Sequence, residues 1–342
     1  MYDSTLQVRS KQIPYFRTDE FSKIMLDMES QIKRCMETSE DSKVAIITGS
    51  GTAGMEAVVS NAFDDRDKVL VINGGSFGHR FVQLCEIYNI QYDEIKLELG
   101  EKFKKEHLES IDGSNYTAML VNIDETSVGQ LYNINIIKEF CQKYNLYLIV
   151  DAISSFMSDE YKMDEWGIDC TIVSSQKALA LAPGLAIITM NKKFYENKIE
   201  NKKPKNLYLN IEEHIKNMKR GQTPFTPAVG VILELKDRLD NIEKIGKDNI
   251  IKETKEKAQY FRKKIMEIDG ITIPDYILSN TVTPIIVKGK AVKIFNNLKD
   301  KYGIFVTPSG GELKEDFLRI GHIGNLDISD YDELIEKIKE EL

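Results

Sequence analysis

The sequence predicts an α/β protein whose mostly parallel sheet is covered by helices, followed by a smaller C-terminal α+β domain. Three observations carry this prediction. Between residues 44 and 189, short apolar runs alternate with stretches of helical periodicity. The runs are apolar throughout, which is typical of strands buried on both faces. From about Pro227 the pattern changes to two long helical stretches and then short strands. We therefore expect a large domain at residues 1–226 and a small domain at 227–342.

The elements of the large domain follow in chain order. A first helix is expected at 18–36, where apolar residues recur at helical spacing. Apolar, β-branched runs predict strands at 44–47, 68–72, 117–121, 146–150, 171–173 and 185–189, and a further strand is expected at 90–97. Helices are expected between them at 55–62, 81–88 and 134–144. The Lys/Asn-rich stretch 191–205 predicts a solvated connection.

The small domain is expected to consist of helices packed on a few short strands. Helical spacing is found at 227–243, 248–267, 290–300 and 328–341. Strands are expected at 283–287, 303–306 and 317–320. The small domain would thus add an α+β layer to the large one.

Composition limits the partners and the location of the protein. The net charge is −8, which argues against nucleic acid as a partner. No apolar run approaches the ~20 residues of a membrane span, and the N-terminus lacks a signal pattern. The four scattered cysteines are typical of buried, reduced thiols, so we expect a cytoplasmic protein that binds no membrane. The four histidines make no metal-spaced pair, and no metal site is expected.

Lys177 is the residue around which chemistry is expected. It lies on the turn between the expected strands 171–173 and 185–189, among small residues. Burial disfavours the charged form of a lysine and lowers its pKa, as a lysine that forms a Schiff base requires. A surface lysine in a loop is the ordinary alternative, and the residues at the other strand ends decide between the two.

A glycine-rich turn, Gly49-Ser50-Gly51-Thr52-Ala53-Gly54, opens the helix that follows the first expected strand. It matches the dinucleotide fingerprint G-x-G-x-x-G. That fingerprint also needs an acid at the end of the next strand, which instead ends in Asn73-Gly74-Gly75. We therefore discount a nicotinamide cofactor. A helix N-terminus opened by small residues still favours a phosphate, with Ser50 and Thr52 as hydroxyl donors, although a tight turn without a ligand has the same pattern.

Three more strand ends carry chemistry-bearing residues. Phe77 follows the second strand among glycines and could stack on a flat ring or cover the sheet edge. Thr126 follows the strand at 117–121, where helix capping is the ordinary explanation. Asp151 ends a strand of five apolar residues, and a buried carboxylate requires a cationic partner or hydrogen bonds. A protonated pyridine nitrogen, a lysine or an arginine would serve as that partner.

Together these residues predict a site for pyridoxal 5′-phosphate. Ligands of such sheets gather outside the carboxyl ends of the strands, where all four signals fall. The glycine-rich turn would hold the phosphate, Phe77 would stack on the ring, Asp151 would meet the pyridine nitrogen and Lys177 would meet the aldehyde.

With these residues the chain resembles the class V aminotransferases, which have the fold-type I architecture of pyridoxal-phosphate-dependent transferases. The resemblance runs from about residue 15 to the C-terminus, and its most specific element is the pair Gln176-Lys177. It implies cofactor contacts for further residues. Ser50-Gly51-Thr52 matches the phosphate loop, and Phe77 matches the aromatic residue that stacks on the ring. Thr126 matches the hydroxyl residue near the phenolic oxygen. Asp151 matches the acid on the ring nitrogen, and Ile153 matches the aliphatic residue under the ring.

The resemblance also implies a homodimer and a substrate contact. The segment 223–227 is similar to one that reaches the phosphate of the neighbouring subunit, which implies cofactor contacts for Thr223 and Thr226 and active sites shared between subunits. Arg319 matches the arginine that grips the substrate carboxylate, and a guanidinium offers a bidentate fork to a carboxylate or a phosphonate. One departure lies at the N-terminus, where this chain has no Pro-Gly-Pro segment of the kind that helps to close the site in relatives.

The implied activity is transamination from a small amino donor to a keto acid. Lys177 would anchor the cofactor and move the proton, and Asp151 would keep the ring nitrogen protonated. Residues 150–156 resemble the branch that uses 2-aminoethylphosphonate with pyruvate, in phosphonate metabolism, and we expect this donor first. Residues 175–184 resemble the alanine/serine–glyoxylate branch, which is the alternative.

Other activities of this fold are less favoured by the sequence. Cysteine desulfurases need a mobile cysteine before the strand of Arg319, and residues 305–318 contain none. Those enzymes also use histidine at the position of Phe77. A lyase that uses the same cofactor and a non-catalytic binding protein on this fold remain as further alternatives.

Overall fold

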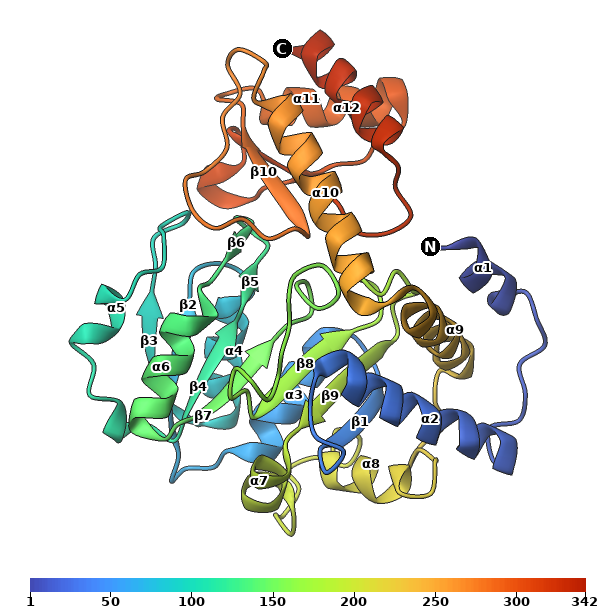
Figure 1. Ribbon diagram of the computed structural model, residues 1–342. Helices are drawn as coiled ribbons and strands as arrows, with labels where there is room; N and C mark the ends of the chain where they lie inside the picture. The colour runs from blue at the N-terminus through green and yellow to red at the C-terminus, as the bar shows by residue number, and fades with distance from the viewer.

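A seven-stranded sheet forms the centre of the computed structural model, which describes residues 1–342 (Figure 1). The strand order is β1-β9-β8-β7-β4-β2-β3. Strand β9 runs antiparallel to both β1 and β8, and all other neighbours are parallel, which confirms the predicted fold class. The strands of this large sheet are β1 (Lys43–Thr48), β2 (Lys68–Asn73), β3 (Gln91–Lys96), β4 (Ala118–Asn122), β7 (Tyr147–Asp151), β8 (Cys170–Ser174) and β9 (Leu185–Met190).

Helices cover both faces of the large sheet, because successive side chains of a strand point to opposite faces. In β7, for example, Leu148 and Val150 enter one core, and Ile149 enters the other. One face is covered by α2 (Asp19–Met36), α6 (Ile134–Tyr144) and α9 (Val229–Ile245). The other face is covered by α3 (Gly51–Ala62), α4 (Gly78–Tyr88) and α8 (Ile211–Met218).

A second, three-stranded antiparallel sheet follows α9 in the chain and has a core of its own. Its order is β10 (Val282–Ile286), β12 (Phe317–Gly321) and β11 (Thr307–Pro308). The helices that pack on it are α10 (Lys247–Ile265), α11 (Ala291–Tyr302) and α12 (Ile328–Glu341). Helix α10 runs from α9 up to this small sheet, so the small sheet lies above the carboxyl ends of the large one (Figure 1).

Two sequence-based expectations are wrong. No strand forms at 303–306, because Gly303 ends α11 in the left-handed conformation and the Ile304 N–H still bonds back to Leu298. The next residue, Phe305, is 77% exposed, and the strand is the short β11. The stretch 191–205 is not a solvated connection over its first half. It forms α7 (Lys192–Phe194) and a π-helical turn (Tyr195–Ile199) whose apolar side chains are buried on the large sheet.

Several short elements have no counterpart among the expected ones. They are α1 (Asp3–Arg9), α5 (Glu106–Glu109), α8 (Ile211–Met218), the hairpin of β5 (Asp124–Glu125) and β6 (Gln130–Leu131), and two 3-10 turns (Gly113–Asn115 and Gly311–Leu313). All four cysteines are buried and unpaired, as expected. None of the helices combines the length and the apolar character that crossing a bilayer requires.

Candidate active site

Lys177 lies just past the carboxyl end of β8, in the turn that leads to β9. The side chain is half-buried and has no hydrogen-bond or ion-pair partner within the chain. Burial lowers the pKa of Lys177, and the nearby carboxylate of Asp124 opposes this shift. Burial therefore shifts the Lys177 amine toward its uncharged form, which is the form that reacts with an aldehyde.

Asp151 ends β7, next to Asn122 at the end of β4. Its carboxylate accepts hydrogen bonds from the Asn122 amide at 2.9 Å and from the Ile153 N–H at 2.9 Å. No basic side chain pairs with it, although only 1% of the residue is exposed. Burial raises the pKa of Asp151 to about 6. The site thus holds a carboxylate that lacks a cation, which is the deficit a protonated ring nitrogen would fill.

The phosphate cradle, Ser50-Gly51-Thr52, opens α3 at the end of β1. Ser50 is the N-cap residue, and its side chain makes no capping hydrogen bond, so the first N–H groups of α3 stay available to an anion. A Cβ at Gly51 would lie 2.4 Å from Ile153 Cδ1 and 3.1 Å from Ser174 Cβ. Only glycine therefore lets the start of α3 come this close to the ends of β7 and β8.

One cleft brings most of the predicted residues together. Eight of them line it: Ser50, Gly51, Thr52, Phe77, Asp151, Ile153, Gln176 and Lys177. Three further lining residues were not identified from the sequence: Arg80, Asn122 and Ser154. The cleft combines an uncapped helix N-terminus, a carboxylate without a cation and a lysine without a partner. Those features fit the phosphate, the ring nitrogen and the aldehyde of pyridoxal phosphate.

Arg80 adds a positive charge to the phosphate cradle. Its guanidinium donates a hydrogen bond to Thr52 Oγ1 at 3.1 Å and lies 5.1 Å from the centroid of the Phe77 ring. No carboxylate pairs with it, so its charge is free to act on an anion at the start of α3. The signal that could have revealed Arg80 is its spacing of three residues from Phe77, which puts both side chains on one face of α4.

Glu125 is a second residue that the sequence did not reveal. Its buried carboxylate accepts from the Gly78 N–H at 2.8 Å and from the Phe77 N–H at 3.2 Å, so it caps the start of α4. A Cβ at Gly75 would lie 2.6 Å from its Cδ, which explains the glycine there. Glu125 therefore fixes the backbone that carries Phe77.

Thr126 and Arg319 lie beside the cleft without lining it. Arg319 extends from β12 in the small sheet and donates to the backbone carbonyls of Thr126 at 2.8 Å and Pro308 at 2.9 Å. Its Nε is buried without a partner, and burial lowers its pKa. Its charge is among those that act on Lys177. The arginine is thus held in place by neutral groups and forms no ion pair, although the nearby carboxylate of Glu125 opposes the lowering of its pKa.

Thr223 and Thr226 are not brought into the cleft of their own chain. The Thr223 hydroxyl donates to the Phe225 carbonyl at 2.7 Å, and Thr226 is exposed. The Phe225 ring stacks on Tyr208, whose hydroxyl donates to the carbonyl of Thr48 at the end of β1. This segment, in which Thr223 is buried and Thr226 exposed, therefore lies near the strand that leads to the phosphate cradle.

Known proteins resemble the chain over most of its length. A family model described as aminotransferase class-V matches residues 7–313. An uncharacterized aminotransferase of Methanocaldococcus jannaschii is 32% identical over 90% of this chain and 81% of its own length. The L-aspartate–glyoxylate aminotransferase of Paracoccus denitrificans is 26% identical over 91% of this chain and 80% of its own. The crystal structure of alanine–glyoxylate aminotransferase from Nostoc sp. superposes with a TM-score of 0.92 at 24% identity, covering 99% and 92% of the two chains, which shows the shared fold.

Proposed function

The chain belongs to the class V aminotransferases, and we propose that it moves an amino group from a small α-amino acid to glyoxylate, with pyruvate as a second acceptor. The family implies pyridoxal phosphate as the cofactor, and an amino donor and a keto acid as substrates. Glyoxylate comes first because relatives named L-aspartate–glyoxylate and serine–glyoxylate aminotransferase align over about nine tenths of this chain. This order reverses the one expected from residues 150–156.

Arg319 is the observation that carries the substrate class. Its guanidinium is half-buried, is held only by two backbone carbonyls and keeps Nε unpaired. A buried arginine without an acidic partner is costly unless an anion completes its hydrogen bonds. The α-carboxylate that amino acids and keto acids share would do so with bidentate geometry, in both halves of the reaction.

The cofactor contacts that we propose follow the layout of the cleft. Bound pyridoxal phosphate supplies an aldehyde that takes up the amino group and a ring that withdraws electrons. The phosphate cradle and Arg80 would hold its phosphate. Phe77 and Ile153 would flank its ring, and Asp151 would hold the proton on its ring nitrogen. Gln176, whose side-chain carbonyl accepts from the Ser174 hydroxyl, would contact the phosphate, and Thr126 would lie near the phenolic oxygen.

Lys177 would hold the cofactor covalently and then act as the base. A lysine accepts a proton only in its neutral form, which burial favours here. Its Nζ would take the proton from Cα of the donor and return it on the cofactor side. The small, buried residues that follow Lys177 exclude water from this transfer.

We also propose a homodimer with shared sites, in which Thr223 and Thr226 meet the phosphate bound by the partner. The support is the position of their segment near the end of β1, where Thr226 is exposed, and the absence of both threonines from the lining of their own cleft. We place the protein in the cytoplasm, where its four unpaired cysteines would stay reduced.

A second candidate donor is 2-aminoethylphosphonate, with pyruvate as acceptor. Three residues of the segment that resembles this branch, Asp151, Ile153 and Ser154, line the cleft. Because this donor has no carboxylate, its phosphonate would have to bind Arg319 in place of a carboxylate.

A donor and acceptor screen tests the proposal. The purified protein, loaded with pyridoxal phosphate, is incubated with alanine, serine, aspartate or 2-aminoethylphosphonate, each with glyoxylate or pyruvate. We expect fastest consumption of glyoxylate with an α-amino acid, and a roughly tenfold or larger rise in the donor KM in Arg319→Lys because the bidentate contact is lost. Turnover of 2-aminoethylphosphonate with pyruvate alone would establish the second candidate instead. A protein that takes up no cofactor would refute both.

A further inference from the structure

The turn that carries Lys177 is held in a strained conformation by its own hydrogen bonds. We call residues 175–184 the lysine loop. Ala180 has a φ of 59°, in the left-handed region that a residue with a Cβ rarely adopts. The Ala180 N–H bonds to the Lys177 carbonyl at 2.8 Å, and the Ser175 hydroxyl donates to the Ala182 carbonyl at 2.7 Å. A strained loop keeps its shape only if its surroundings overdetermine it.

One contact from outside the loop completes this set of bonds. Glu234, in the second turn of α9, is only 1% exposed. Its Oε2 accepts a hydrogen bond from the Ala182 N–H at 3.0 Å. Its Oε1 lies 3.4 Å from Nε of Arg9, at the end of α1. A buried carboxylate is costly unless it is paired, and Arg9 of the N-terminal helix supplies a positive charge beside Glu234.

We propose that Glu234 is a positioning residue that holds the lysine loop, and with it Nζ of Lys177, in the geometry needed for proton transfer, and that Arg9 of α1 supports it. The inference rests on the proposed role of Lys177. Glu234 contacts neither the cleft nor any residue that lines it, and it acts through the backbone at Ala182. Proton transfer is sensitive to small displacements, so a loop released at one bond would slow chemistry more than substrate binding.

The contact between Arg9 and Glu234 also connects α1 to the lysine loop. Helix α1 lies along α9 (Figure 1), where Ser4 donates to Asp237 at 2.9 Å and the Tyr2 ring lies 4.3 Å from the Arg238 guanidinium. Of these contacts, only the pair Arg9–Glu234 continues to the lysine loop. The N-terminal helix would thus support the active site through Glu234.

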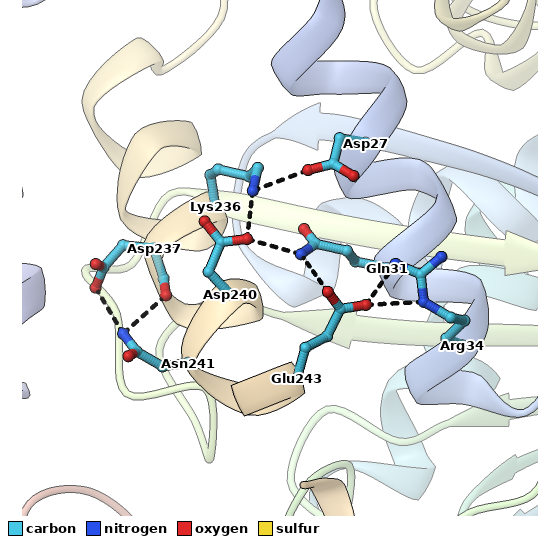
Figure 2. Close-up of polar contacts among 8 residues, drawn as sticks. All are labelled: Asp27, Gln31, Arg34, Lys236, Asp237, Asp240, Asn241 and Glu243. Atoms are coloured by element: carbon cyan, nitrogen blue, oxygen red, sulfur yellow. Dashed lines mark hydrogen bonds and ion pairs between the residues drawn. The ribbon is translucent and has the colours of Figure 1, made fainter. Parts of the chain in front are cut away.

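Asp237 provides a matched control on the same helix. Its carboxylate accepts hydrogen bonds from Ser4 of α1 and from Asn241 of its own helix, and it makes no hydrogen bond with the lysine loop. Figure 2 shows Asp237 and Asn241 on the side of α9 turned away from α2. Asp237→Ala therefore loosens α1 without removing the bond to Ala182.

The test compares the cofactor-loaded parent with Glu234→Ala, Glu234→Asp, Glu234→Gln and Asp237→Ala. Hydrogen exchange is measured in a peptide spanning residues 175–185, and kcat and KM are measured for the best donor. In Glu234→Ala we expect faster exchange in this peptide and a roughly tenfold fall in kcat with the donor KM within about twofold of the parent. Glu234→Asp is too short to reach Ala182 and should behave in the same way. Glu234→Gln keeps the accepting oxygen and should retain most of the parent kcat.

Each possible result either supports or overturns the inference that Glu234 holds the lysine loop. Parent-like exchange and kcat in Glu234→Ala, or in Glu234→Asp if the alanine variant does not fold, would overturn the inference. An equal change in Asp237→Ala would also overturn it, because the effect would then come from general loosening of α1. A parent that takes up cofactor but carries out no transamination refutes the proposed function alone, since loop exchange still reports whether Glu234 holds the loop.

Discussion

At the scale of single residues, Asp151 has an environment poorly suited to its own charge. Two hydrogen-bond donors meet its carboxylate, yet burial still raises its pKa to about 6. In the cofactor-free protein the folded state therefore binds a proton that the unfolded chain has already released at the same pH. The charged cofactor ring would reverse this preference by supplying the missing cation.

The first prediction concerns the pH dependence of cofactor-free stability. Because the folded pKa of Asp151 lies above its unfolded value of about 4, stability should fall as pH rises from about 4 to 7, by up to roughly 3 kcal/mol from this group. Asp151→Asn should lose that part of the slope. Urea unfolding of both proteins across this window measures the difference. Parallel stability curves for the two proteins would contradict the assigned environment.

The second prediction concerns Arg80. Arg80→Gln should weaken binding of pyridoxal phosphate by roughly tenfold, because a charged donor at the phosphate cradle becomes a neutral one. The release of the cofactor during dialysis is measured by its absorbance in the visible range. Arg66→Gln is the control, since Arg66 is an exposed arginine paired with Asp64 outside the cleft. Equal cofactor affinity in both variants would show that Arg80 serves only to pack against Phe77.

The sequence revealed those site residues that directly follow an apolar strand. Lys177, Asp151 and Phe77 stand out because a polar or aromatic side chain ends a buried run, and parallel strands bring such ends to one edge. Their assigned roles stay predictions. Arg80 and Glu234 lie inside helices, where their contacts depend on how each helix is rotated and packed. That information is tertiary: the spacing of three residues between Phe77 and Arg80 is a local sign of it, and Glu234 has no such sign.

At the scale of elements, the joint between α2 and α9 is held by charged side chains arranged around one buried amide. Gln31 of α2 is 1% exposed and donates both amide hydrogens, to Asp240 at 2.8 Å and to Glu243 at 3.0 Å. Figure 2 shows this amide between the two carboxylates, which also pair with Lys236 and Arg34. Helix α9 is thereby fixed on the face of the sheet opposite α3.

The third prediction follows from this joint. Gln31→Met keeps the volume and removes both donors, and it should lower the free energy of unfolding by about 1–3 kcal/mol. Chemical denaturation of the cofactor-loaded protein measures this. Lys252→Ala breaks an exposed helix pair with Glu256 at 3.8 Å and should have no measurable effect. A stability loss of the same size in the control would show that the assay reports general helix damage.

Long elements were easier to predict from the sequence than short ones. The helices at 134–144 and 328–341 have the expected bounds, because their apolar residues repeat over several turns. The expected strand at 303–306 failed because three apolar residues after a helix carry no period long enough to distinguish a strand from an extended exit. Helix α1 has too few residues for a periodic signal, and its position depends on contacts with α9.

At the scale of the whole molecule, the chain passes gradually from the large sheet to the small one. The buried apolar residues of α9, such as Leu235 and Leu239, belong to a core of the large sheet, and Phe261 of α10 belongs to the core of the small sheet. The division at residues 226 and 227 stays a prediction. Arg319 reaches from the small sheet to Thr126 at the edge of the large one, so any movement of the small sheet would move the proposed substrate contact.

The last prediction tests shared active sites by mixing subunits. Lys177→Ala lacks the base, and the double variant Thr223→Ala, Thr226→Ala lacks the proposed contacts to the partner's phosphate; each should have little activity alone. In a dimer with composite sites, a hybrid of the two has one intact site, because Lys177 of one subunit meets the threonines of the other. Random reassociation should therefore restore activity to about a quarter of the parent, since half of the dimers are hybrids with one working site each.

Lys177→Ala mixed with Asp151→Ala is the control, because both residues serve the same cleft and neither site of that hybrid is complete. If the threonine mixture gains no more activity than this control, the sites are not shared, and the segment at 223–227 acts only within its own chain.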